Sequence, residues 1–598
     1  MTILDKVNTP ADVKVLTKDE LKVLAHDVRQ AILNRDSKIG GHLGPNLGVV
    51  EMTIALHKVF HSPIDKFVWD VSHQSYPHKI LTGRKNAYLE DDKFHEVTGF
   101  STQHESEHDF FTVGHTSTSV ANAHGLAMAR DLQGNTGNVV AILGDGAFSG
   151  GLAMEGLNAA GDYRKNLIII LNDNEWAIAE NHGGMYRHLA QLRESQGTAE
   201  NNIFKSFGLD YRYLEQGNDI VSLVELFESV KDIDHPIVLH IHTLKGHGYE
   251  PAIKDPENMH QAWGPFDVET GRPTFDMPAG RTYNDVIHDV MDEHIAKGEP
   301  IIAINAAIPF VFDLKKFAKK YPERYIDGGI AEQFTVTFGG ALALGGARPI
   351  IFHTASFLQR AFDQIVHDWG INKEPAVMIV RYGLIGGTDQ THQGSFAYAV
   401  TSNIPNVIDL APTSEEDLKA MLEFALSQKE HPVIIHIPEL GFENRANALT
   451  DYSKAKYQIT KQGSKVAILG LGSMYSRGEA LAEELEIDGI KATVINPSFV
   501  NLLDKETLRD LTQNHDVFVT IEDGTLDGGF GQKVASFLGQ FDVKTLNFGA
   551  DTEFIDSVPM DELYQRYHLT PELMAMDINE VLKTSKVSGG MFKRLFAK

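Results

Sequence analysis

Short apolar runs alternate with longer amphipathic stretches along most of the chain, and this alternation restricts the fold more than any other feature. The runs include "NVVAIL" at 138–143, "LIIIL" at 167–171 and "IVLHIH" at 237–242. Continuous apolar runs of this length are typical of strands buried on both faces, as in parallel sheets. The first amphipathic stretch begins with a capping box formed by Thr17 and Glu20. The sequence therefore predicts an α/β fold with parallel strands.

The alternation stops and restarts twice, which predicts several domains in a chain of 598 residues. The stretch 254–282 is rich in Pro, Gly and Asp and has no periodicity, so we interpret it as a linker. A second polar stretch precedes a third series of strands, which begins with "KVAILG" at 465–470. We expect three parallel-sheet α/β domains, at residues 1–265, 280–445 and 460–598.

The charge balance and the missing residue types exclude several classes of function. Asp and Glu number 81 against 54 Lys and Arg, and the formal net charge of -27 disfavours nucleic acid or an anionic membrane as the main partner. The absence of cysteine excludes disulfides, thiolate metal sites and a cysteine nucleophile. The sequence contains no long uncharged apolar run and no pattern typical of a signal peptide. We therefore expect a cytoplasmic protein that acts on small molecules.

Two polar turns follow two of the predicted strands and suggest a ligand site. "GDGAFSGG" at 144–151 and "NDNEW" at 172–176 both begin where a buried strand ends, which is where open parallel sheets bind ligands. Asp145 and Asn174 would offer the oxygen ligands that Mg²⁺ prefers. Gly144 and Gly146 would let the backbone approach a diphosphate. Alone, each turn is ordinary, but together they predict a diphosphate cofactor held through magnesium.

These turns look like the thiamine diphosphate motif of the transketolase superfamily, and further sequence blocks narrow the match. The blocks are "GGHLGPNLGVVEM" at 40–52, "VWDVSHQSYPHKILTGR" at 68–84, "VGHTSTS" at 113–119, "KGHGYEPAIKDP" at 245–256, "GIAEQ" at 329–333, "SFLQRAFDQIVHD" at 356–368 and "THQG" at 391–394. In these blocks, and in their order, the chain resembles the 1-deoxy-D-xylulose-5-phosphate synthase family. The resemblance implies a transketolase-like architecture and a homodimer.

The resemblance also implies which residues bind the cofactor. Mg²⁺ would be coordinated by Asp145, Asn174 and the main chain of Trp176. Phe357 would stack on the aminopyrimidine ring of thiamine diphosphate, although most phenylalanines in such runs belong to the core. The full set of implied cofactor-binding residues is His73, Gly114, His115, Ser117, Gly144, Asp145, Gly146, Ala147, Asn172, Asn174, Glu332, Phe357 and Arg360.

Catalytic roles are implied for one carboxylate and several histidines. Glu332 would share a proton with the aminopyrimidine ring and so promote removal of the thiazolium proton. His42 and His392 would position the acceptor and transfer protons, and His115 would hold the cofactor-bound intermediate. The implied substrate-binding residues are His42, His260, Arg381 and His392.

By resemblance, the chain would decarboxylate pyruvate and join the two-carbon unit to D-glyceraldehyde 3-phosphate. The product would be 1-deoxy-D-xylulose 5-phosphate, which would connect the chain to isoprenoid and thiamine biosynthesis. One alternative is a related ketol or acyl transferase with a different acceptor, phosphorylated or unphosphorylated, and a second is a 2-oxo acid decarboxylase subunit that serves a lipoyl partner. A distant third is a zinc hydrolase, because "HESEH" at 104–108 fits H-E-x-x-H, but the preceding "TGFSTQ" indicates a loop and we interpret the match as chance.

The chain also departs from the family pattern. Thr388 stands where an aspartate is usual, Gln103 where an arginine is frequent, and "IPELG" at 437–441 replaces a stretch that would supply a second phosphate-binding arginine. Glu439 or Leu440 cannot bind a phosphate as an arginine does, so the identity of the acceptor is open. The segment after residue 181 is shorter than expected, so we expect its behaviour as a lid to differ.

Overall fold

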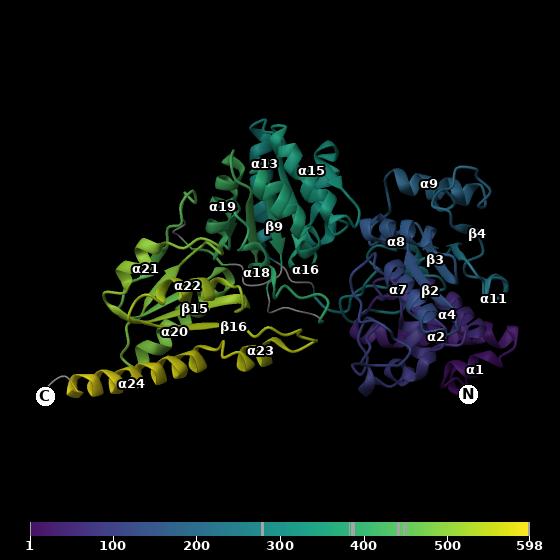
Figure 1. Ribbon diagram of the computed structural model, residues 1–598, viewed down its shortest axis with the longest axis horizontal. Coiled ribbons are helices and arrows are strands. Elements are labelled where there is room, and N and C mark those ends of the chain that lie inside the picture. The colour runs from purple at the N-terminus through teal and green to yellow at the C-terminus, as the bar shows by residue number, and fades with distance from the viewer. Residues whose placement is uncertain are drawn as a thin grey trace. The chain divides into compact units, whose positions relative to one another are not determined.

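The computed structural model describes residues 2–276, 280–381, 383, 389–438, 443–445, 449 and 451–595 (Figure 1). The chain forms two compact units. The first contains residues 1–279 with 329–331, and the second contains residues 280–328 with 332–598. The first unit contains one sheet and the second contains two. Nearly all strand pairs are parallel, which confirms the predicted α/β fold. The boundaries of the three expected domains remain predictions.

The sheet of the first unit has five parallel strands in the order β1-β2-β3-β5-β4. They are β1 (Lys66–Trp69), β2 (Val139–Gly144), β3 (Leu167–Asp173), β4 (Asp210–Leu214) and β5 (Pro236–His242). Alternate residues of each strand point to opposite faces. Val139 and Ala141 pack on α7 (Ser119–Leu132) and α8 (Gly151–Gly161), whereas Val140 and Ile142 pack on α4 (Val50–Val59) and α11 (Ile220–Val230). The continuous apolar runs in the sequence therefore reflect a sheet covered on both faces.

Residues 255–276 follow α12 (Glu250–Lys254) and belong to the first unit, although the sequence indicated a linker here. The N–H of Gly41 donates to the carbonyl of Ala262, and the N–H of Ala262 donates back to Gly41. Phe266 is buried in the core around α2 (Lys18–Ile39), which begins with the predicted capping box of Thr17 and Glu20. The linker interpretation was wrong here because backbone pairing and one buried aromatic residue leave no periodic pattern.

The second unit begins with a six-stranded parallel sheet in the order β10-β11-β9-β8-β6-β7. Its strands are β6 (Ile301–Asn305), β7 (Tyr325–Asp327), β8 (Arg348–Thr354), β9 (Val377–Arg381), β10 (Ile408–Leu410) and β11 (Val433–Ile437). One face packs on α13 (Tyr283–Ala296) and α19 (Glu415–Ser427). The other face packs on α15 (Glu332–Leu344) and on η8 (Ile365–Ile371), which contains the buried Trp369.

The third sheet also belongs to the second unit and has the order β12-β14-β13-β15-β16. Its strands are β12 (Gln458–Lys461), β13 (Lys465–Gly470), β14 (Thr493–Asn496), β15 (His515–Thr525) and β16 (Lys544–Ala550). The faces pack on α20 (Tyr475–Ile487) with α24 (Pro571–Leu595), and on α22 (Phe530–Leu538). The edge strand β12 runs antiparallel to β14 and is mostly exposed. Within the described ranges, no helix has the length and apolar character needed to span a membrane.

Candidate functional site

The two polar turns predicted to share a ligand lie side by side in the first unit. Gly144 at the end of β2 is in register with Asn172 in the adjacent strand β3. Asp145 Oδ2 accepts hydrogen bonds from the N–H of Asn174 at 3.2 Å and from Asn181 Nδ2 at 3.0 Å. The N–H of Trp176 donates to Asn174 Oδ1 at 3.1 Å. The structure therefore brings together the three residues predicted to coordinate Mg²⁺.

The electrostatics of these turns favour a cation at Asp145. Asp145 is 2% exposed, and its carboxylate accepts hydrogen bonds from neutral N–H groups. Burial, together with the nearby charge of Asp173, raises the pKa of Asp145 well above its usual value. For Asp173 burial acts in the same direction, but contacts with His240 and Arg193 outweigh it and lower the pKa to about 2. A buried carboxylate is costly unless cations balance it, so Asp145 fits a divalent cation.

The predicted diphosphate contacts come from the same edge of the sheet. A Cβ atom on Gly144 would meet no heavy atom within 4 Å, so space remains beside this residue. Ser117 Oγ donates to the carbonyl of Ala147 at 2.9 Å, and the N–H of Ser117 donates to Asp70 Oδ1 at 2.7 Å. Gly114 and His115 precede Ser117 in the segment before α7. The residues present can therefore cradle a diphosphate group.

Lys245 is a functional candidate that the sequence analysis did not single out, although it begins a block that carries the resemblance. Its side chain is buried, and Nζ donates to the carbonyl of Ala177 at 2.7 Å. Burial lowers the pKa of Lys245 to about 7, while the charges of Asp145 and Glu257 oppose this shift. A buried ammonium beside the glycine turn is suited to a phosphate group. The signal in the sequence was its position just after β5, the strand that pairs with β3.

Three of the predicted histidines converge in the first unit. The ring centroids of His42 and His73 are 5.3 Å apart, those of His42 and His260 are 5.9 Å apart, and those of His73 and His260 are 5.2 Å apart. Asn46 Nδ2 donates to the carbonyls of His42 and His73, which connects their two segments. Burial lowers the pKa of His260 well below its usual value, so its ring is neutral.

The second unit contains the remaining predicted residues. Glu332 is the first residue of α15 and is 2% exposed, and Arg360 Nη1 donates to Glu332 Oε2 at 3.1 Å. Burial raises the pKa of Glu332, although the charge of Arg360 opposes the shift. The rings of Phe357 and His392 meet edge to face at 5.6 Å between centroids. Arg381, at the end of β9, donates to the carbonyl of Val311.

The structure agrees with the interpretation of the H-E-x-x-H match at 104–108 as chance. The segment forms turns rather than a helix, and His104 is exposed. Glu105 Oε2 pairs with Lys79 Nζ at 2.6 Å and with Arg84 at 2.9 Å. His108 Nδ1 shares a hydrogen bond with Ser62 Oγ at 2.8 Å. These contacts occupy the glutamate that would have to act as a base.

Arginines that could replace the missing phosphate ligand are engaged elsewhere in the second unit. Arg445 donates to Glu479 Oε2 at 2.6 Å and to Ser476 Oγ at 3.0 Å. In the first unit, Gln103 is exposed, and its Nε2 donates to the carbonyl of Phe110 at 2.6 Å. Thr388, Glu439 and Leu440 lie outside the described residues. Arg445 is therefore not expected to replace the second phosphate-binding arginine.

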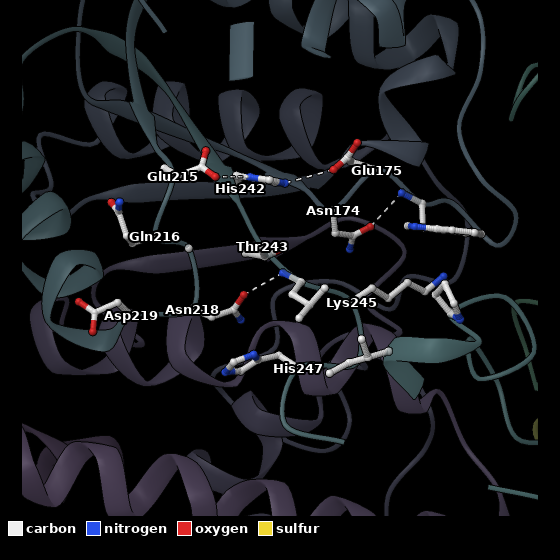
Figure 2. Close-up of a pocket in the computed structure, with 15 residues that line it drawn as sticks. Asn174, Glu175, Glu215, Gln216, Asn218, Asp219, His242, Thr243, Lys245 and His247 are labelled. Carbon is white, nitrogen blue, oxygen red and sulfur yellow. Dashed lines mark hydrogen bonds and ion pairs between the residues drawn. The ribbon is translucent and has the colours of Figure 1, made fainter. Parts of the chain in front are cut away.

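A cavity of about 610 Å³ lies beside the turn of Asn174 (Figure 2). Asn174, Trp176 and Lys245 line one side of it. Figure 2 shows His242 between two carboxylates, at 3.2 Å from Glu215 and 3.3 Å from Glu175. The cavity thus extends from the predicted metal ligands to the ends of β4 and β5.

The segment after residue 181 contains α9 (Gly184–Glu194), which packs on the first unit through Leu189 and Leu192. The hydroxyl of Tyr186 donates to the carbonyl of Asp145 at 3.2 Å. This segment therefore contacts the turn of Asp145 directly.

Comparisons with known proteins agree with the geometry. Residues 4–201 match the family described as 1-deoxy-D-xylulose-5-phosphate synthase, residues 279–442 match the transketolase pyrimidine binding domain, and residues 455–574 match the transketolase C-terminal domain. 1-Deoxy-D-xylulose-5-phosphate synthase 1 of Geobacter sulfurreducens is 37% identical over 605 residues, covering 94% of each chain. The synthase of Desulfitobacterium hafniense is 38% identical over 613 residues, covering 95% of this chain and 96% of that protein. The synthase of Natranaerobius thermophilus is 36% identical, covering 98% of this chain and all of that protein.

Proposed function

The chain belongs to the 1-deoxy-D-xylulose-5-phosphate synthase family, and from that premise we propose that it condenses pyruvate with D-glyceraldehyde 3-phosphate. Carbon dioxide leaves pyruvate, and the remaining two-carbon unit joins the aldehyde to give 1-deoxy-D-xylulose 5-phosphate for isoprenoid biosynthesis. The observation that carries this proposal is the 37% identity to a named synthase over 94% of the chain. The enzyme is a thiamine diphosphate-dependent, transketolase-type transferase. A cytoplasmic location and a link to thiamine biosynthesis stay predictions.

The first unit would hold the cofactor through its diphosphate. Asp145, Asn174 and the carbonyl of Trp176 would coordinate Mg²⁺, and Lys245 would pair with the diphosphate. Support comes from the buried carboxylate of Asp145, the buried ammonium of Lys245 and the open space beside Gly144. When bound, thiamine diphosphate supplies a ring that stabilises the carbanion left by decarboxylation.

Glu332 would share a proton with the aminopyrimidine ring by taking it up and releasing it. Its raised pKa lets the carboxyl group keep a proton at a pH at which an exposed glutamate is ionised. Arg360 fixes the orientation of Oε2 through the hydrogen bond at 3.1 Å. Phe357 would stack on the same ring, and His392 contacts the edge of Phe357.

The histidines would position the substrates. A neutral ring at His260 can donate or accept a hydrogen bond without bringing a charge into a buried cluster. His42 and His73 contact this ring, so one substrate oxygen could meet several of these groups. His42 and His392 would transfer protons to and from the acceptor, and His115 would hold the intermediate. Arg381 would contact the substrate phosphate.

We also propose a homodimer, in which a second copy covers an apolar face of the second unit. Phe334 and Phe338 stack on α15 with ring centroids 5.1 Å apart, and Phe334 is 48% exposed. Phe362 on α17 (Phe362–Gln364) and Ile371 on η8 are also exposed. Large exposed apolar residues on neighbouring elements are typical of interfaces, and two-fold dimers are the commonest assembly.

The direct test is product identification. Purified protein is incubated with thiamine diphosphate, Mg²⁺, pyruvate and a panel of aldehydes, and the products are identified by mass spectrometry. We expect 1-deoxy-D-xylulose 5-phosphate from pyruvate and D-glyceraldehyde 3-phosphate. Transfer from a ketose phosphate but not from pyruvate, or acyl transfer to a lipoyl group alone, would contradict the proposal.

A further inference from the structure

Arg193, near the end of α9, contacts the turn that contains Asn174 and Trp176, here called the metal turn because it is proposed to hold Mg²⁺. Its Nη1 donates to Asp173 Oδ2 at 2.5 Å, and its Nη2 donates to Glu175 Oε2 at 2.7 Å. Asp173 and Glu175 are the two neighbours of Asn174 in the chain. One guanidinium therefore holds both sides of a proposed metal ligand, with the fork geometry that a lysine cannot reproduce.

Each carboxylate that Arg193 holds is also anchored to the sheet. Asp173 Oδ2 lies 2.8 Å from His240 Nε2, and His240 Nδ1 shares a hydrogen bond with the hydroxyl of Tyr211 at 2.8 Å. This inner row runs from β3 across β5 to β4 and is buried. The outer row is the one in Figure 2, in which His242 lies between Glu175 and Glu215. Arg193 joins the two rows at the metal turn.

The backbone of this turn needs such support. Glu175 has a φ of 69°, in the left-handed region that non-glycine residues rarely adopt. Such a conformation persists only where the surroundings hold it. The carbonyl proposed to bind Mg²⁺ belongs to the next residue, Trp176, so relaxation at Glu175 would displace a ligand.

Arg193 also neutralises two of the negative charges at the turn, those of Asp173 and Glu175. Asp145 and Asp173 are both buried, at the ends of the neighbouring strands β2 and β3. Arg193 pairs with Asp173 Oδ2, and His240 Nε2 lies 2.8 Å from the same oxygen. Arg193 is thus the counter-ion of Asp173 and not of Asp145. A magnesium-bound diphosphate still carries negative charge, so a cation that neutralises Asp173 and Glu175 also reduces its repulsion.

We propose that Arg193 is a positioning residue for the magnesium diphosphate site, holding the turn of Asn174 and Trp176 in its binding conformation by clamping Asp173 and Glu175. The proposal rests on the proposed function, since it requires thiamine diphosphate to bind at this turn. Arg193 does not contact the cofactor or the reacting atoms in this arrangement. Its effect is on how tightly the cofactor binds.

The test is calorimetric titration of cofactor-free protein with thiamine diphosphate in excess Mg²⁺. We expect Arg193→Ala to raise Kd at least tenfold, Arg193→Lys to raise it less, and Arg187→Ala, an exposed arginine on the same helix, to change it less than twofold. Hydrogen exchange supplies a readout of position. Amides of residues 172–178 should exchange faster in Arg193→Ala than in the parent protein, while those of β2 should not change.

A second variant decides the matter if Arg193→Ala does not fold. Glu175 is 51% exposed at its side chain, so Glu175→Gln should fold while losing the charge that strengthens the outer contact of the clamp, and we expect Kd to rise severalfold. A Kd within twofold of the parent for every variant that folds would overturn the clamp while leaving cofactor binding intact. Failure of the parent protein itself to bind thiamine diphosphate would instead overturn the proposed function, and the clamp with it.

Discussion

Arg360 donates a hydrogen bond to Glu332 across 3.1 Å, from the segment after β8 to the first residue of α15. Burial raises the pKa of Glu332, and the guanidinium counteracts part of that shift. The contact also fixes the orientation of one carboxylate oxygen, Oε2. This arrangement suits a group that exchanges a proton and does not bind substrate.

Replacing Glu332 should therefore impair turnover more than binding. We expect Glu332→Gln to lower kcat by about 10²–10⁴-fold, because an amide cannot take up or release the proton. The Kd for thiamine diphosphate with Mg²⁺ should change little, since the diphosphate is proposed to bind elsewhere. Glu323→Gln, at an exposed glutamate of the same unit, is the control. A near-normal kcat for Glu332→Gln would show that its role is misassigned.

Removing the metal should abolish activity. EDTA-treated protein is expected to lose turnover with any donor and to recover it with Mg²⁺, because Asp145 and Asn174 offer oxygen ligands to a hard cation. Asp145→Asn should resist recovery, since the amide removes the negative charge at the site. The assay is pyruvate consumption before and after metal addition. Full activity in cofactor-free protein, or recovery with Zn²⁺ alone, would count against the assignment.

The proposed dimer can be tested at its apolar face. Light scattering at micromolar concentration should give twice the chain mass for the parent protein. Phe334→Asp places a charge in the proposed interface and should shift the protein towards monomer. Val15→Asp changes a residue that is 81% exposed in the first unit and should leave the mass unchanged. A monomeric parent protein would rule out the dimer under these conditions.

Much of the fold was predictable because its cause is local. A strand covered on both faces must be apolar throughout, so β2, β3 and β5 appear as continuous runs in the sequence. β12 was not predictable in this way, because it is an exposed edge strand of polar residues. Its position depends on backbone hydrogen bonds to β14, which leave no mark on side-chain pattern.

The candidate site likewise contains residues that could be predicted from local sequence and residues that could not. Asp145 and Asn174 could be paired from sequence, because the ends of adjacent parallel strands meet at one edge. Lys245 and Arg193 were missed, because their importance comes from contacts between segments far apart in the chain. The H-E-x-x-H match at 104–108 was interpreted as chance because the residues before it indicate a loop, but the pairing of Glu105 with Lys79 and Arg84 could not be predicted from spacing alone.

A buried carboxylate in the third sheet predicts a pH effect on stability. Glu522 is fully buried, accepts hydrogen bonds from the N–H groups of Phe530 and Gly531, and has its pKa raised by burial to about 7 from 4.5. The folded state then holds a proton that the unfolded state has lost, so stability falls as the pH rises from about 4.5 to 7.

Glu522→Gln should remove this dependence. The free energy of unfolding of the variant, relative to the parent protein, should rise across that window by at most about 3 kcal/mol. Urea titrations at several pH values measure it, and Glu486→Gln, at an exposed glutamate, is the control. A constant difference between Glu522→Gln and parent across the window would contradict the prediction.

The acceptor preference tests the departure from the family pattern. If two arginines normally hold the acceptor phosphate, losing one removes a charge-assisted pair worth roughly 1.5–3 kcal/mol, or about ten- to hundredfold in affinity. Arg360 is already paired with Glu332 and Arg445 with Glu479, so neither is expected to replace the phosphate-binding arginine. We therefore expect D-glyceraldehyde 3-phosphate to be used less efficiently than in a typical synthase, with weaker discrimination against glyceraldehyde. The ratio of kcat/KM for the two aldehydes measures this, and a preference for the phosphate above about a thousandfold would exceed what one remaining arginine can supply.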